Sequence, residues 1–226
     1  MAVKDEIKEQ QQKLRGKGLK EKFQYFFEYY KWQTIAIIIA TFFIVVLTKD
    51  VILNLRDPYL YGVFINSSGT LDTESVIPDF AAYANINTAK TPITLETNLS
   101  YSSGENNTSI DIYTPTKIMA LSESSDVDFM LCDLDAMNNF SSPGYFIDIR
   151  QVLTDSQIEQ YKDFFYYQED EELGSIPVGI KVSNSPFLSQ TNSFQGDAYF
   201  AVFYTSKNKQ NAVQFLEFMY EKGTSQ

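Results

Sequence analysis

The longest apolar run of the chain lies near its amino terminus. Residues 32–48 form 17 consecutive uncharged positions between Lys31 and Lys49. A helix of this length is at the short end of what crosses a hydrocarbon core about 30 Å thick. Apolar turns on either side lengthen the helix, and lysine side chains at its ends can reach the headgroups. The pattern therefore predicts one transmembrane helix over 32–54, with its core at 32–48.

The residues before this run indicate its orientation. Seven of the ten residues at 23–32 are aromatic, a composition typical of the membrane–water interface. The segment 1–31 carries eight Lys/Arg against five Asp/Glu. Because the basic side of a spanning helix stays inside the cell, we expect a basic cytoplasmic tail with an aromatic interfacial helix at 1–31. The rest of this single-pass chain is then extracellular, held at the lipid bilayer.

A cleavable signal peptide is the alternative interpretation of the same run. The apolar region of such a peptide has about 7–15 residues and ends at a small-x-small cleavage site. Here the run continues through Leu47 and Thr48 to Lys49 without such a site. The sequence therefore favours an uncleaved anchor.

Beyond the anchor, short apolar runs alternate with segments of helical periodicity. Strands are predicted at 60–65, 93–101, 127–132, 176–182 and 198–204. Helices are predicted at 75–85, 113–122, 134–140, from 155 to 165, and at 208–220. Strands that alternate with helices favour an α/β domain at 57–226, with a single doubly wound, mostly parallel sheet and helices on both faces.

Charge and composition narrow the possible functions. From Asp50 onward the chain has nine Lys/Arg and 24 Asp/Glu, a net charge of about -15, which excludes nucleic-acid binding through phosphate neutralisation. The sequence has no histidine, which removes the usual general base and most zinc sites. Cys132 is the single cysteine and lies in an apolar run, so we expect a buried, inert thiol. We expect no enzyme activity, no cofactor and no metal.

Two segments carry a resemblance to a known family. The first is Asp126–Leu131, followed by a short helix and then by Gly144–Ile149. The second is Tyr199–Phe203, followed by Ser206-Lys207-Asn208 and by Ala212–Leu216. This order resembles extracellular solute-binding proteins, the receptors of ABC importers, which have the type II periplasmic-binding fold. The basic tail, aromatic entry and anchor are also similar to those of uncharacterised membrane proteins of clostridial bacteria.

The chain departs from that family at one point. In those receptors the strand equivalent to 176–180 leads into a second lobe of a hundred residues or more. Here about 14 residues, 184–197, precede the next predicted strand. The resemblance therefore implies a single lobe, and tight solute capture between two lobes is not implied. We expect a membrane-anchored accessory protein that docks on a membrane complex such as an ABC transporter, or alternatively a tethered receptor with a shallow small-molecule site.

The candidate ligand-binding residues follow two predicted strands. Asp133 and Asp135 come after the strand 127–132, and Asn66 and Ser67 come after the first strand. In open α/β sheets ligands bind beyond the carboxyl ends of the strands, so these four residues are the candidates. The alternatives are that Asp133 or Asp135 caps the next helix and that Asn66 and Ser67 form only a turn.

A second candidate surface lies later in the chain. Tyr166 and Tyr167 follow two phenylalanines, and these tyrosines are candidates for contact with a partner. The acidic run 169–172 comes directly afterwards, and we predict a solvated turn there.

Overall fold

The computed structural model describes residues 18–54, 57–68, 71–102, 112–142, 144–170 and 174–221. The chain divides into two compact units, Met1–Leu55 and Arg56–Gln226. The described part of the first unit is one helix, α2, over Leu19–Asn54.

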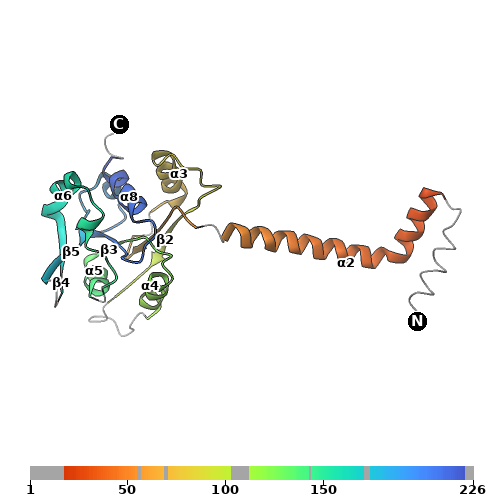
Figure 1. The fold of residues 1–226 in the computed structure, drawn as a ribbon, viewed down its shortest axis with the longest axis horizontal. Coiled ribbons are helices and arrows are strands. Elements are labelled where there is room, and N and C mark those ends of the chain that lie inside the picture. The colour runs from red at the N-terminus through yellow and green to blue at the C-terminus, as the bar shows by residue number, and fades with distance from the viewer. Residues whose placement is uncertain are drawn as a thin grey trace. The chain divides into compact units, whose positions relative to one another are not determined.

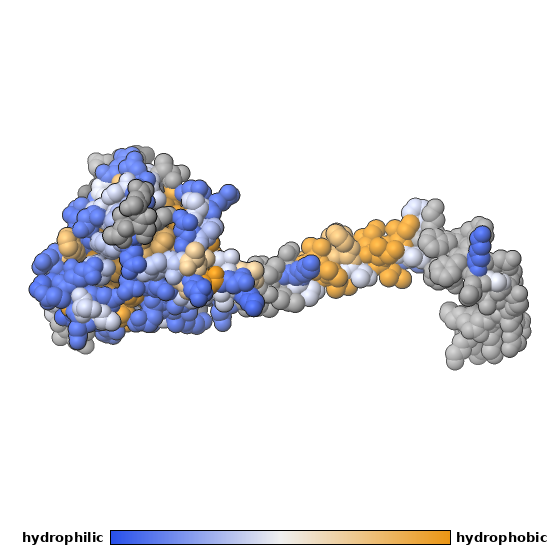
Figure 2. Space-filling model, turned by 90° about the horizontal axis from the view of Figure 1, so that it is seen from above, coloured by the Kyte–Doolittle hydropathy of each residue, from blue (hydrophilic) through white to orange (hydrophobic). Residues whose placement is uncertain are grey.

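Helix α2 contains the apolar run. Its segment Trp32–Lys49 is long and apolar enough to cross a membrane, and none of the segment is buried. The hydroxyls of Thr41 and Thr48 donate to carbonyls one turn earlier, which leaves the outside of the helix apolar. Figure 2 shows the resulting hydrophobic surface along α2. By length and composition, this segment fits a membrane span or the apolar part of a signal sequence. Most of the predicted basic tail, residues 1–17, lies outside the described residues.

The second unit is built on a six-stranded mixed sheet with the strand order β2-β1-β3-β6-β5-β4 (Figure 1). Its strands are β1 Leu60–Ile65, β2 Ile93–Leu99, β3 Phe129–Asp133, β4 Phe165–Asp170, β5 Gly174–Lys181 and β6 Ala198–Val202. Strand β1 pairs in parallel with both β2 and β3. The remaining pairs, β3 with β6, β6 with β5 and β5 with β4, are antiparallel.

Helices cover both faces of this sheet. They are α3 Thr73–Tyr83, α4 Tyr113–Glu123, α5 Leu134–Ser141, α6 Asp155–Tyr161, α7 Pro186–Thr191 and α8 Lys209–Glu221, with short 3-10 turns at Ile149–Gln151 and Lys162–Phe164. One buried cluster joins the sheet to α3, α6, α7 and α8, and a second joins it to α4 and α5. Alternate residues of β1 enter the two clusters, Phe64 the first and Val63 the second, because side chains of a strand point to opposite faces.

The described members of the two clusters run from Tyr59 to Tyr220, within the second unit. A fragment comprising residues 57–226 therefore contains all the described core of the α/β domain and is the one chosen for the experiments below.

The sheet corrects one sequence prediction. The mostly parallel arrangement holds for β2-β1-β3, and the other half of the sheet is antiparallel. Strand β4 was not predicted, because Phe164 and Phe165 continue the apolar spacing of the preceding helix. Only three residues, 171–173, separate β4 from β5, and so short a connection permits only antiparallel pairing. Of the predicted acidic turn, Glu169 and Asp170 belong to β4, and residues 171–172 lie outside the described residues.

A buried aspartate joins the start of β3 to the start of α8. Asp128, with 1% of its surface exposed, accepts hydrogen bonds from the Ser206 hydroxyl at 2.7 Å and from the Tyr61 backbone N–H at 2.8 Å. It also accepts from the Asn208 side-chain amide at 3.4 Å, and that amide donates to the Pro58 carbonyl at 3.2 Å. The Ser206-Lys207-Asn208 motif therefore has a structural role here.

Candidate functional site

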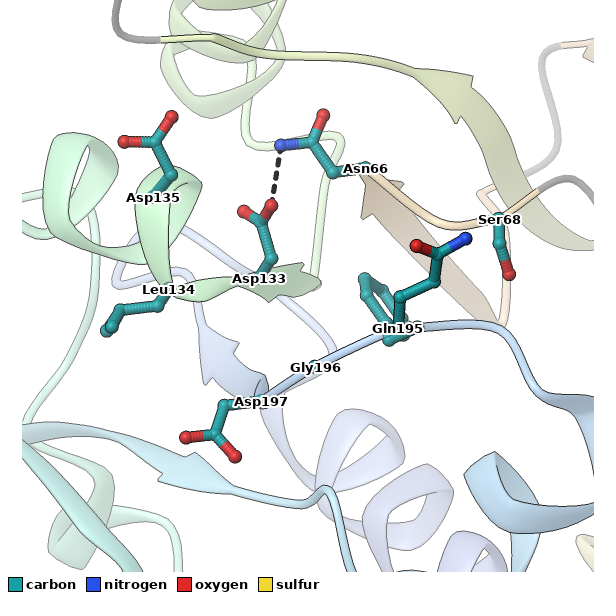
Figure 3. Close-up of a pocket in the computed structure, with 9 residues that line it drawn as sticks. Asn66, Ser68, Asp133, Leu134, Asp135, Gln195, Gly196 and Asp197 are labelled. Carbon is teal, nitrogen blue, oxygen red and sulfur yellow. Dashed lines mark hydrogen bonds between the residues drawn. The ribbon is translucent and has the colours of Figure 1, made fainter.

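A cavity of about 540 Å³ lies at one edge of the sheet (Figure 3). It is found where β1 and β3 end and where β6 begins. Its lining consists of Asn66, Ser68, Asp133, Leu134, Asp135, Phe194, Gln195, Gly196 and Asp197. Three of the four candidate ligand residues, Asn66, Asp133 and Asp135, therefore lie together in one cavity.

The topology of the sheet explains why a cavity forms at this edge. Strand β1 has β2 on one side and β3 on the other. The chain leaving β1 enters α3 on one face of the sheet, and the chain leaving β3 enters α5 on the opposite face. The two connections diverge and leave a crevice between them. Such switch points are where open α/β sheets bind ligands.

Asn66 holds the ends of three strands together. Its side-chain amide donates to Asp133 Oδ2 at 2.9 Å and to the Tyr101 carbonyl at 2.8 Å, and its Oδ1 accepts from the Tyr101 N–H at 2.7 Å. Its φ of 60° is left-handed, a conformation that asparagine tolerates better than most residues. The cavity therefore has a well-defined wall where β1, β2 and β3 end.

Asp133 has two roles in the same place. Its Oδ1 accepts from the Ala136 N–H at 3.0 Å and caps helix α5, which is the capping alternative drawn from the sequence. Its Oδ2 accepts from Asn66 and faces the cavity with it (Figure 3). Asp135 lies in the first turn of α5 and also lines the cavity. Capping and ligand binding are thus compatible for Asp133.

The two serines after β1 both hold the loop in place, but only one of them lines the cavity. Ser67 does not line the cavity, and its hydroxyl donates to the Thr97 carbonyl at 3.1 Å. Ser68 does line it, and its N–H donates to the Ser193 carbonyl at 2.7 Å. The Ser68 hydroxyl donates to the Asn192 carbonyl at 2.6 Å. These bonds fasten the loop after β1 to the segment that precedes β6.

That segment, 194–197, supplies the wall that sequence reasoning missed. Phe194 packs partly against the core, and Gln195, Gly196 and Asp197 reach the cavity surface. The segment follows α7, which was not predicted because it has only six residues. Ser185 before Pro186 is a helix-start signal that could have found α7, since serine is a favoured cap and proline suits the first turn.

The charge of the cavity comes from three carboxylates on two segments. Asp133 and Asp135 lie at the start of α5, and Asp197 lies before β6. The hydrogen bond from Lys181, whose Nζ is 2.7 Å from Asp197 Oδ2, holds the pKa of Asp197 below its ordinary value. Within the described part of the chain, no group of three acidic, histidine or cysteine side chains is placed to hold a metal ion.

The candidate partner residues lie on a different part of the domain, on strand β4. Tyr166 is half-buried, its hydroxyl donates to Asn138 Oδ1 at 2.7 Å, and its ring meets Tyr199 edge-on at 5.4 Å. Tyr167 is 51% exposed and packs against Phe165. Tyr166 is thus engaged in packing within the domain, whereas Tyr167 presents surface to the solvent.

Comparison with known proteins adds no relative. The resemblance to extracellular solute-binding proteins therefore stays a prediction from the sequence motifs alone. No family model, curated protein or solved structure matches the chain.

Proposed function

We propose that this chain is a membrane-anchored, extracellular binding protein whose α/β domain takes up a small solute in the cavity between β1, β3 and β6. The observation that carries the proposal is the position of that cavity at a switch point of the sheet. The exposed apolar segment Trp32–Lys49 supports the anchor, and the basic residues before it support the orientation.

The construction of the cavity also supports solute binding. Its volume of about 540 Å³ is within the range of small-molecule sites, about 300–1,000 Å³. Its walls are cross-braced by the hydrogen bonds of Asn66 and Ser68, so little ordering is required when a ligand enters. A single lobe covers a ligand from one side only, so we expect modest affinity, weaker than that of a clamp with two lobes.

We expect the soluble fragment 57–226 to bind at least one solute from a panel of sugars, amino acids, short peptides and polyamines. Thermal-shift screening detects the binding, and titration calorimetry measures its affinity. Asn66→Ala and Asn66→Gly should both weaken that affinity by about tenfold or more, because both remove the amide that positions Asp133. Asn66→Gly keeps the left-handed backbone and separates loss of the amide from backbone strain.

Asn85→Ala is the matched control for this experiment. Asn85 also has a left-handed φ, 53°, but follows α3 and does not line the cavity. It should lose some stability and keep the affinity. A panel in which no solute changes the melting temperature would contradict the proposal, as would a solute whose affinity is the same in all three variants.

The second candidate function is docking on a membrane complex such as an ABC transporter. The observation that favours it is the short connection between β5 and β6, which holds α7 where the resembling receptors carry a second lobe. The cavity then lacks the opposite wall that those receptors have, and a membrane partner would supply that cover.

We expect the full-length chain in mild detergent to co-purify with the subunits of such a transporter, identified by mass spectrometry. Tyr167→Ala should reduce the recovery at least several-fold if the exposed face of β4 contributes. Tyr204→Ala is its control, because Tyr204 is similarly exposed, 55% against 51%, and lies outside β4. Recovery of the chain alone under all extraction conditions argues against docking.

A further inference from the structure

We propose that the cavity selects small organic cations, in particular aliphatic diamines, over neutral and anionic solutes of the same size. This inference rests on the proposed function, since it names the class of solute for the same site. Three features of the site support it: the acceptor groups that line the cavity, the aspartate that caps the start of helix α5, and the placement of the carboxylates on two segments.

The lining offers acceptors on several sides. It contains the carboxylates of Asp133, Asp135 and Asp197, together with the amide groups of Asn66 and Gln195. None of the described residues that line it is lysine or arginine. Lys181 on β5 pairs with Asp197 and offsets one of the three negative charges. An ammonium group entering the cavity would therefore exchange its hydration water for carboxylate and amide oxygens, which accept charge-assisted hydrogen bonds from it.

Anions are disfavoured by the way α5 begins. A helix start at a switch point commonly binds phosphate or carboxylate through its free N–H groups and its positive dipole end. In this domain Asp133 already occupies that position, with Oδ1 accepting from the Ala136 N–H at 3.0 Å. Asp135 adds a second negative charge in the first turn. The carboxylates of Asp133 and Asp135 would therefore repel an incoming anion at the position where a helix start normally offers N–H donors.

The spacing of the charges favours an organic cation over a metal ion. No three described acidic side chains are placed to coordinate one ion, and the carboxylates instead stand on two segments, the start of α5 and the residues before β6 (Figure 3). Leu134, which is 44% exposed, and Phe194 supply apolar surface to the same cavity. An aliphatic diamine offers ammonium groups to the carboxylate and amide oxygens of this lining and methylenes to its apolar side chains.

The test compares three four-carbon probes of the same length on the fragment 57–226: putrescine, 1,4-butanediol and succinate. Calorimetry at low ionic strength should show putrescine binding at least about tenfold more tightly than the diol, and no binding of succinate. Asp133→Asn and Asp135→Asn should each weaken putrescine binding by about tenfold. Asparagine caps helices as well as aspartate does, so Asp133→Asn can keep the cap of α5, but it loses the acceptor for the Asn66 amide, whereas Asp135→Asn leaves that hydrogen bond in place. Asp163→Asn, an exposed acid outside the cavity, should change nothing.

The outcomes separate this inference from the proposed function. Putrescine that fails to bind, that binds no better than the diol, or that is unaffected by both cavity variants overturns the inference. If a neutral or anionic solute of the panel binds instead and depends on Asn66, the proposed function stands and the cation preference is wrong. If no solute binds, putrescine included, both are wrong.

Discussion

Replacing Asp128 with alanine is expected to lower the free energy of unfolding of the 57–226 fragment by about 3–5 kcal/mol, the cost of leaving buried hydrogen-bond donors unpaired. The carboxylate is buried and accepts hydrogen bonds from Ser206, Tyr61 and Asn208. Alanine would leave the Ser206 hydroxyl and the Tyr61 N–H without this acceptor in a buried region, where each unpaired group costs about 1–3 kcal/mol, while the Asn208 amide would keep its bond to the Pro58 carbonyl. The hydrogen bonds that would be lost join the starts of β1, β3 and α8.

Urea unfolding followed by circular dichroism measures this loss. Asp126→Ala is the control, because Asp126 has the same side chain two residues earlier and is exposed. It should unfold within about 0.5 kcal/mol of the wild type. If both variants are equally stable, Asp128 has no special role in joining these elements.

The same residue gives a pH dependence with a definite sign. Burial is the largest influence on Asp128 and raises its pKa, although the hydrogen bonds from Ser206, Tyr61 and Asn208 oppose the shift. A raised pKa in the folded state means that the carboxyl contributes most to stability below its unfolded pKa of about 3.9. That contribution is lost as the pH rises through the folded value. The stability of the wild type relative to Asp128→Asn should therefore fall as the pH rises from about 3.5 to neutral.

Gly62→Ala should destabilise the same fragment by about 3 kcal/mol. Gly62 lies in β1, opposite Phe129 in β3, and a Cβ at this position would come within 2.1 Å of Phe129 Cζ. The Phe129 ring cannot move freely, because it stacks on Phe200 at 5.1 Å and on Phe215 at 4.8 Å. Overpacking at a fully buried ring therefore strains the centre of the sheet.

A double variant tests this explanation for Gly62. Phe129→Leu removes the ring atoms that a new Cβ would meet, so Gly62→Ala should cost much less in the Phe129→Leu background than in the wild type. Gly196→Ala is the control, because a Cβ at Gly196 has nothing within 4 Å. Equal costs of Gly62→Ala in both backgrounds would contradict a clash with Phe129.

The apolar helix and most elements of the domain could be predicted because their signals are local. The run 32–48 needs only length and the absence of charge, and the structure contains an exposed helix there. Strand β1 lies at 60–65, as predicted, and α5 begins at Leu134, as predicted. For α5 the spacing of the apolar side chains matches the face that becomes buried, and for β1 a continuous apolar run matches a strand buried on both faces.

One wall of the cavity could also be predicted from the sequence. Asn66, Asp133 and Asp135 follow strands that run parallel, so their carboxyl ends meet at one edge of the sheet. The bond between Asn66 and Asp133 is a consequence of that neighbourhood, since β1 and β3 are adjacent although 67 residues separate the two side chains in sequence.

The other wall was decided by tertiary structure alone. Residues 194–197 reach the cavity because β6 runs antiparallel to β3, so that the start of β6 lies beside the end of β3. Strand order and direction depend on pairing between distant segments, and nothing in the local periodicity of 198–202 specifies them. The sequence by itself thus determined the apolar anchor segment, the α/β class and the residues that end β1 and β3. The mixed sheet and the second wall of the cavity required the packed fold, because they arise from contacts between segments that are remote in the chain.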